Sequence, residues 1–465
     1  MKVLYFFFFL FSMFSYADEP SDNLKKIIKS HHFKEDSLGL YIEDEGREIF
    51  NLNAGHMMVP ASLTKIVTGA AVLNYFPMNK KFETKLMTSN SFNEGVLKGD
   101  LCLKGGGDPA FVSEKMWYLV NELTRAELKV VEGDITVDAS RFDDELYDTG
   151  RESVRVDRAF DAPISAASFN WNSTNIFIRP GDKSGALAKI ILDPVSDYLE
   201  LENKVKTTSK SGLKNVEATR VKSGNHDKII VSGVISLDVP EVVIYKNISN
   251  PNLWIGMHLK EFLKQRGITV KGKIKIGNCD KLAISVASAS SKSLNEIISD
   301  MLKFSNNFVA EMLAKNLAAE EGVAPAKMKD GIEIIKKYMD TLGFERKDYI
   351  FENVSGLTRD NRFSAKQLAH ILGVVKNDFL LFPEFASGLP IAGVDGTLKN
   401  RLNKKMTAQV LVRAKTGYLD GVVGLAGYIG RKNRSPLIFV FMFNGDYQQG
   451  LAARPLFDDL INQLI

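Results

Sequence analysis

The sequence predicts an α/β protein in which an antiparallel sheet, flanked by helices, is built from both ends of the chain. Alternating apolar residues over 38–50 indicate an N-terminal β-hairpin, and three strand-like runs lie near the C-terminus. Between about 82 and 287, short alternating segments and turn signals predominate, with one helical pattern at 254–265. The middle of the chain is therefore expected to be a β-rich insertion. The C-terminal runs are 409–414, 422–429 and 437–443.

Composition indicates an ordinary globular protein of two or three domains. The chain has 465 residues, which exceeds what one hydrophobic core usually holds. Hydrophobic residues make up 45% and charged residues 25%, and the net charge of +4 is small for this length. Composition therefore gives no argument for nucleic acid as a partner.

The N-terminus has the pattern of a secretory signal. Met1 and Lys2 precede an apolar run over 3–14, and Ser15-Tyr16-Ala17 then supplies small residues at the cleavage-site positions. We expect cleavage before Asp18 and an exported, periplasmic protein, because no later stretch is long and apolar enough to span a membrane. In such a compartment Cys102 and Cys279 either pair or remain two buried thiols, and neither has zinc-site spacing.

The first elements lead to a helix with a serine at its start. A short amphipathic helix is expected over 24–32, then the hairpin, then a loop over 51–59. Apolar residues next recur at helical spacing, and Pro77 ends the pattern. Ser62 and Lys65 stand three residues apart, so they lie on one helix face. A neutral, partly buried lysine one turn away can activate a serine nucleophile.

Two further motifs follow in order. Ser305-Asn306-Asn307 interrupts helical spacing over 291–320, and a second helix-rich block extends to about 375. Lys415-Thr416-Gly417 closes a strand-like run, where a cation, a hydroxyl and a glycine suit a substrate carboxylate. Each motif alone is weak, but Ser-x-x-Lys, Ser-x-Asn and Lys-Thr-Gly in this order form the signature of penicillin-recognising serine enzymes.

With these motifs the chain resembles the class C low-molecular-mass penicillin-binding proteins, which are D-alanyl-D-alanine carboxypeptidase/endopeptidases. The resemblance covers nearly all of the mature chain, and it implies a transpeptidase/β-lactamase-like catalytic domain carrying inserted β-rich domains. One departure is Asn306, because the family usually has aspartate there; the middle residue is more often structural, so we expect activity to survive. The further matching stretches are 103–109, 355–361 and 389–398.

These considerations predict the domain boundaries. We expect a signal peptide at 1–17, a catalytic domain formed by 18–84 and 286–465, and an inserted region at 85–285. A division of the insertion into two subdomains is expected, one formed by 85–165 with 240–285 and the other by 166–239.

The resemblance implies a role for each motif residue. Ser62 attacks the penultimate D-alanine carbonyl, Lys65 takes its proton, and Ser305, helped by Lys415, passes a proton to the leaving amine. Asn307 binds the substrate backbone. Substrate is also bound along the strand: Lys415 and Thr416 hold the terminal carboxylate, Gly417 permits close approach, and the amides of Ser62 and Tyr418 form an oxyanion hole.

Arg359 and Asp420 are further candidates for the pocket that receives the peptide side chain, and solvated turn residues are an equally good interpretation of both. Asp420 is placed to pair with the ammonium of a diamino acid. The turn at 170–172 is expected to border the same pocket. The six histidines show no pairing that favours a Ser-His-Asp mechanism.

The sequence therefore predicts a periplasmic serine D-Ala-D-Ala carboxypeptidase, with endopeptidase activity also plausible. Peptidoglycan peptides are the expected substrates and β-lactams the expected covalent inhibitors. No metal, cofactor or nucleic acid is expected; peripheral contact with membrane or wall is open, as is the oligomeric state. The alternatives are a β-lactamase and an inactive cell-wall binding protein.

Overall fold

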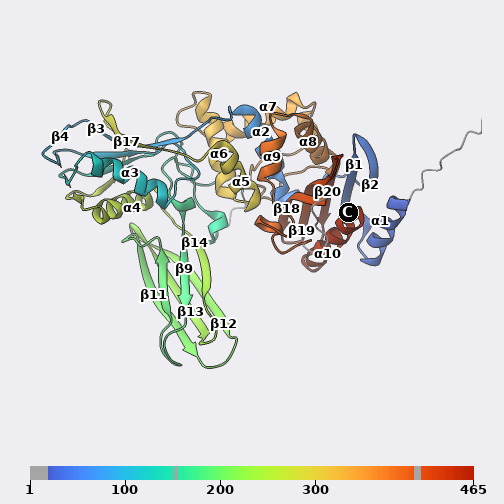
Figure 1. Cartoon of the computed structure of the whole chain (residues 1–465), viewed down its shortest axis with the longest axis horizontal. Coiled ribbons are helices and arrows are strands. Elements are labelled where there is room, and N and C mark those ends of the chain that lie inside the picture. The colour runs from blue at the N-terminus through green and yellow to red at the C-terminus, as the bar shows by residue number, and fades with distance from the viewer. Residues whose placement is uncertain (1–18, 149, 152–154, 403–409) are drawn as a thin grey trace, which may run out of the picture.

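The computed structural model describes residues 19–148, 150–151, 155–402 and 410–465 (Figure 1). Its main sheet has the strand order β18-β19-β20-β1-β2, and every neighbouring pair is antiparallel. The two ends of the chain meet where β1 pairs with β20, with Leu40 opposite Phe441. The predicted α/β sheet built from both termini is thus confirmed. The strands are β1 (Leu38–Asp44), β2 (Arg47–Leu52), β18 (Val410–Leu419), β19 (Val422–Arg431) and β20 (Arg434–Asn444).

Helices cover both faces of this sheet, which explains the nearly continuous apolar run in β20. Phe439 and Phe441 belong to the core beneath α1 (Glu19–Ser30) and α10 (Tyr447–Leu464). Ile438 and Val440 face the opposite core, which is formed with helices from other parts of the catalytic region. Those helices are α2 (Thr64–Tyr75), α5 (Leu294–Lys303), α6 (Asn307–Glu320), α7 (Met328–Thr341), α8 (Ala365–Asn377) and α9 (Phe382–Gly388).

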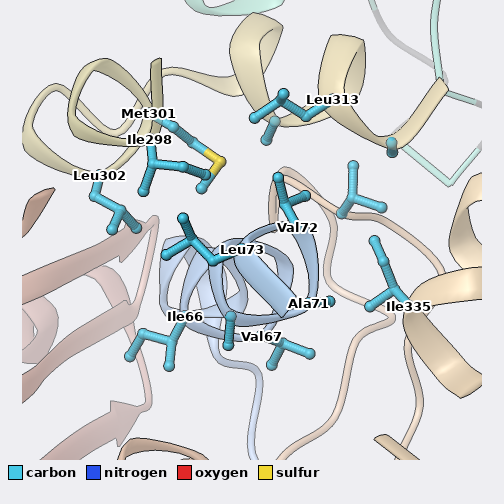
Figure 2. Close-up of a cluster of buried hydrophobic side chains, with 14 of the residues drawn as sticks. Ile66, Val67, Ala71, Val72, Leu73, Ile298, Met301, Leu302, Leu313 and Ile335 are labelled. Atoms are coloured by element: carbon cyan, nitrogen blue, oxygen red, sulfur yellow. The ribbon is translucent and has the colours of Figure 1, made fainter. Parts of the chain in front are cut away.

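Helix α2 lies at the centre of the second core (Figure 2). The sequence indicated one apolar face, but every residue from Thr64 to Leu73 is buried. Side chains of α5, α6 and α7 surround it, among them Met301, Leu313 and Ile335 (Figure 2). Because α2 begins at Thr64, two residues after Ser62, this packing fixes the position of the serine.

Among its described residues, the inserted region contains four further sheets and two α-helices. One sheet has the order β16-β8-β6-β3-β17, and another has the order β15-β7-β5-β4. The sequence predicted only the second helix, α4 (Pro251–Gln265); it missed α3 (Ser113–Arg125), whose Met116, Leu119, Val120 and Leu123 form a clear apolar stripe. The strands are β3 (Glu83–Thr88), β4 (Phe92–Asn93), β5 (Val96–Leu97), β6 (Leu101–Lys104), β7 (Val130–Val131), β8 (Ile135–Asp138), β15 (Thr269–Val270), β16 (Ile274–Ile276) and β17 (Ile284–Ser290).

The other two inserted sheets form an arm that projects from the rest of the molecule (Figure 1). Their orders are β10-β9-β14 and β11-β13-β12. The insertion joins the catalytic region through β3 and β17. These two strands pair with each other, and Glu83 lies opposite Ser290. The predicted boundaries at 85 and 285 stay a prediction. The strands of the arm are β9 (Ser173–Arg179), β10 (Lys189–Asp193), β11 (Leu199–Thr208), β12 (Lys214–Ser223), β13 (His226–Ser236) and β14 (Val242–Asn247).

Cys102 of β6 and Cys279, which follows β16, form a disulfide, with their Cα atoms 5.6 Å apart. The sequence left open whether these two cysteines pair or remain free thiols, and the structure shows that they pair. Within the described residues, no helix has the length and apolar character that crossing a bilayer requires. The predicted signal peptide, 1–17, lies outside the described residues.

Candidate active site

Ser62 and Lys65 meet at the start of α2. Ser62 lies in a single 3₁₀ turn, η2 (Ala61–Leu63), and Lys65 is in the first turn of the helix that follows. The Lys65 Nζ lies 3.2 Å from the Ser62 Oγ. It also donates to the Asn307 Oδ1 at 2.7 Å and to the Ser355 carbonyl at 2.5 Å. The predicted serine–lysine pair is therefore within hydrogen-bonding distance.

Lys65 is fully buried, and burial holds its pKa well below the usual value. The nearby positive charges of Lys415 and Arg151 lower this pKa further, while Glu311 opposes them. This environment favours the neutral form of the Lys65 amine. Such an amine has a lone pair that accepts a proton from Ser62.

Ser305 and Lys415 form a second pair. The Lys415 Nζ donates to the Ser305 Oγ at 2.8 Å and to the Thr416 carbonyl at 2.6 Å. Burial lowers the pKa of Lys415 to about 7. Ser305 itself has a φ of +55°, in the left-handed region, where it connects α5 to α6. This conformation is costly for a residue other than glycine, and such positions cluster at functional sites.

Asn306 and Asn307 have different tasks. Asn306 is the N-cap of α6, and its side chain accepts a hydrogen bond from the Val309 amide at 3.2 Å. Asparagine caps a helix about as well as aspartate, which accounts physically for the departure from Ser-Asp-Asn. Asn307 faces Lys65 through its Oδ1, while its Nδ2 donates to the Phe160 carbonyl at 3.0 Å.

Strand β18 forms the opposite wall and lies close to the serine turn. A Cβ on Gly417 would lie 2.9 Å from the Pro60 carbonyl oxygen, so glycine permits this approach. Thr416 donates through its Oγ1 to the Thr397 Oγ1 at 2.8 Å, and Tyr418 is 40% exposed. The three motifs, far apart in sequence, thus surround one space.

This space is a cavity of about 800 Å³. Six of the predicted residues in addition to Ser62 and Ser305 line it, whereas the two lysines lie buried behind it. Arg359 and Asp420 lie next to each other, because the Arg359 guanidinium donates a hydrogen bond to the Asp420 backbone carbonyl at 2.6 Å. The turn 170–172 is not among the lining residues, and Asn172 is buried in local hydrogen bonds instead. The six are Asn307, Arg359, Thr416, Gly417, Tyr418 and Asp420.

The sequence missed the insertion's own contribution to the cavity. The segment 155–161 supplies four lining residues, and two arginines come from the C-terminal region. No motif marks them, because the fold alone brings these segments to the site. A cluster of arginine and aspartate over 151–161 was the one available signal. These residues are Arg155, Val156, Phe160, Asp161, Arg401 and Arg454.

A buried ion pair holds this segment against the catalytic helix α6. Both Arg151 and Glu311 have fully buried side chains and form two hydrogen bonds, one of them 2.8 Å from Nε to Oε1. Arg151 also donates to Asp161 at 2.6 Å. Glu311 stands four residues after Asn307, so the pair lies one turn behind the site. Breaking it would leave a buried charge without a partner.

The geometry suits acyl transfer through a serine ester. It provides a nucleophile, a buried amine that accepts its proton, a hydroxyl paired with a second amine, and a strand edge for an extended peptide. None of the six histidines, all of them described, lines the cavity. His258 is buried in the insertion, where burial lowers its pKa to about 4.

Comparisons with known proteins agree with this arrangement. A family model described as the D-Ala-D-Ala carboxypeptidase 3 (S13) family matches residues 21–463. A D-alanyl-D-alanine carboxypeptidase of Actinomadura sp. (strain R39) is 28% identical over 398 residues, which are 83% of this chain and 73% of that protein. DacB of Haemophilus influenzae, also a D-alanyl-D-alanine carboxypeptidase, is 25% identical over 406 residues, which are 86% and 84% of the two chains.

Solved structures show the same fold. Penicillin binding protein 4 (dacB) from Haemophilus influenzae aligns with a TM-score of 0.79 at 24% identity, covering 95% of this chain and 99% of that one. A structure of that protein complexed with a β-lactam aligns with a TM-score of 0.74 at 23% identity and the same coverage. A predatory endopeptidase from Bdellovibrio bacteriovorus aligns with a TM-score of 0.52 at 17% identity, covering 92% of each chain.

Proposed function

The chain belongs to the D-Ala-D-Ala carboxypeptidase 3 (S13) family, and we propose that Ser62 performs that family's hydrolysis on peptidoglycan stem peptides. The enzyme is a serine-type DD-peptidase. The observation that carries the assignment of residues is the buried Lys65 amine, 3.2 Å from the Ser62 hydroxyl. The proposal includes export to the periplasm after removal of residues 1–17.

Acylation begins with the Ser62 hydroxyl. Its oxygen attacks the carbonyl carbon of the penultimate D-alanine while its proton passes to the Lys65 amine. The carbonyl oxygen becomes an oxyanion, to which the amides of Ser62 and Tyr418 donate. One such donor is typically worth about 3–4 kcal/mol in the transition state. The start of α2 adds a favourable dipole at the same place.

The leaving group then departs as an amine. The C–N bond breaks as the nitrogen takes the proton that Lys65 received from Ser62, relayed through the Ser305 hydroxyl, so that Lys65 is neutral again. The Ser305 hydroxyl accepts a hydrogen bond from Lys415 at 2.8 Å. Thr416 and Lys415 hold the carboxylate of the departing D-alanine, and Asn307 orients the acyl side of the peptide. Water next attacks the ester carbonyl, Lys65 takes a proton from it, and the Ser62 oxygen leaves and is protonated again.

Two substrates contain the bond that this site accepts. One is the free D-Ala–D-Ala end of a stem, and the other is the D-alanyl cross-link between two stems. Among the structural relatives are proteins named as endopeptidases as well as a penicillin binding protein. β-Lactams acylate Ser62 in this proposal, since one relative is complexed with such a compound.

The test is the intact mass of the purified mature protein after benzylpenicillin, with Ser62→Ala as control. We expect one stable adduct on the wild type and none on the variant. No adduct with penicillin intact would overturn the proposal and favour an inactive binding protein. No adduct with penicillin consumed would indicate a β-lactamase instead.

A further inference from the structure

The side chains of a tyrosine and an arginine stand on the cavity wall and have no part in the reaction described above, which uses only the backbone amide of the tyrosine. Tyr418 of β18 and Arg454 of α10 both line the cavity, and the Arg454 guanidinium carbon lies 4.5 Å from the centre of the Tyr418 ring. A cation over an aromatic face keeps its charge and most of its N–H donors. The ring therefore positions the guanidinium without neutralising it.

The pair lies on one particular side of β18. Side chains alternate along a strand, so Lys415 and Gly417 face the serine turn while Thr416 and Tyr418 face the other way. The contact that a Cβ on Gly417 would make with Pro60 confirms the first direction. Arg454, over the Tyr418 ring, thus lies on the side of β18 that carries Thr416, one of the two residues proposed to hold the leaving group's carboxylate.

Charge pairing separates Arg454 from the other arginines of the cavity. Arg155 pairs with Asp161 at 3.0 Å, Arg401 pairs with Asp458 at 2.6 Å, and Arg359 donates to a backbone carbonyl. Arg454 has no ion pair or hydrogen bond with any residue in the described part of the chain; its one specific contact is the Tyr418 ring. Its charge is therefore available to an anion that enters the cavity.

We propose that Arg454, positioned by Tyr418, binds a second carboxylate on the leaving group and so favours cleavage of cross-links. This inference rests on the proposed function. A departing D-alanine has one carboxylate, which Thr416 and Lys415 hold, and it offers Arg454 no further anion. A cross-linked stem departs as a whole peptide that carries additional carboxylates from its acidic residues. The bond cleaved and the proton transfers are the same for both substrates.

The experiment compares kcat/KM for two substrates, a linear pentapeptide ending in D-Ala–D-Ala and a DD-cross-linked stem dimer. The enzymes are the wild type, Arg454→Gln, Arg454→Lys and the control Arg434→Gln, which removes the same charge from an exposed position at the far end of β20. We expect Arg454→Gln to lower kcat/KM for the dimer about tenfold, mainly through KM, and that for the pentapeptide less than about threefold. Arg454→Lys should retain part of the preference because it retains the charge.

Salt provides a second measurement. Added salt should lower the wild-type kcat/KM for the dimer more steeply than that of Arg454→Gln, since the contact is between exposed charges. Equal losses on both substrates, an unchanged dimer rate, or a wild type that cleaves only the pentapeptide would each overturn the inference. Benzylpenicillin acylation of the same samples distinguishes this failure from failure of the proposed function, because acylation needs Ser62 but no second carboxylate.

Discussion

At the scale of single residues, two buried lysines give the site its chemistry. Both have pKa values lowered by burial, yet the proposed reaction needs them in opposite states. Lys65 must be neutral to accept the Ser62 proton, whereas Lys415 must be charged to hold a carboxylate. Their environments allow this difference, because the pKa of Lys65 is lowered further by the charges of Lys415 and Arg151.

The two lysines predict the pH dependence of acylation. The pKa of Lys415 is about 7, so its charge is present below that pH and is lost as the pH rises through it. The second-order rate of acylation by benzylpenicillin should therefore fall above about pH 7 in the wild type. In the variant Lys415→Arg, the arginine stays charged at all these pH values. We expect this variant to be acylated more slowly than the wild type, but without a fall in rate above pH 7.

The measurement is the acylation rate between pH 5 and 10 for both proteins. The acid side of the profile should be the same in both proteins, because Ser62 and Lys65 are unchanged. An alkaline fall of the same size and position in both proteins would show that another group is responsible.

At the scale of elements, short turns place the catalytic groups. Ala61, just before the nucleophile, has a φ of +47°, and Ser305 has a φ of +55°. Gly356, with a φ of +78°, packs on the first of these turns: a Cβ there would lie 2.0 Å from the Ala61 carbonyl oxygen. The serine turn is thus held by a neighbouring loop as well as by its own helix.

Sequence patterns predicted the helices and strands better than they predicted these turns. The helix of Lys65, the interhelix loop of Ser305 and the strand of Lys415 were predicted because periodicity and motif order coincide there, whereas Ser62 lies in the 3₁₀ turn just before the helix. Segment 155–161 could not be placed, since its position depends on the Arg151–Glu311 pair across 160 residues of sequence. Helix α3 could have been predicted from its apolar stripe but was assigned to a β-rich region.

Gly356→Ala tests the packing on the serine turn. The added methyl group requires the turn to shift, and a displacement near 1 Å can cost about 100-fold in rate. We expect acylation by benzylpenicillin to slow by that order. Gly343→Ala is the matched control: Gly343 has a similar φ of +84°, but a Cβ there meets nothing within 4 Å.

Both variants should lose about 1–2 kcal/mol of stability from the left-handed backbone. Only Gly356→Ala should lose acylation. If the two variants acylate at equal rates, the contact between Gly356 and Ala61 does not position the nucleophile.

At the scale of the whole molecule, the insertion is fixed in two ways. The Cys102–Cys279 disulfide joins β6 to the segment that follows β16 within the insertion, across 177 residues of sequence. The Arg151–Glu311 pair and the Asn307–Phe160 hydrogen bond instead join the insertion to the catalytic helix α6. The disulfide stabilises the inserted sheets, whereas the contacts with α6 hold the cavity wall in position.

These two roles are separable by substitution. Cys102→Ser with Cys279→Ser should lower the free energy of unfolding by about 2–5 kcal/mol, toward the upper end because the closed loop is long. Acylation of the folded variant should stay within about twofold of the wild type, because segment 155–161 keeps its own contacts with α6.

Arg151→Met should instead slow acylation, because it releases segment 155–161 from α6 and leaves Glu311 buried without a partner. Denaturant unfolding and penicillin acylation of the same samples test both statements. A folded cysteine variant that loses acylation in parallel would show that the disulfide also shapes the cavity wall.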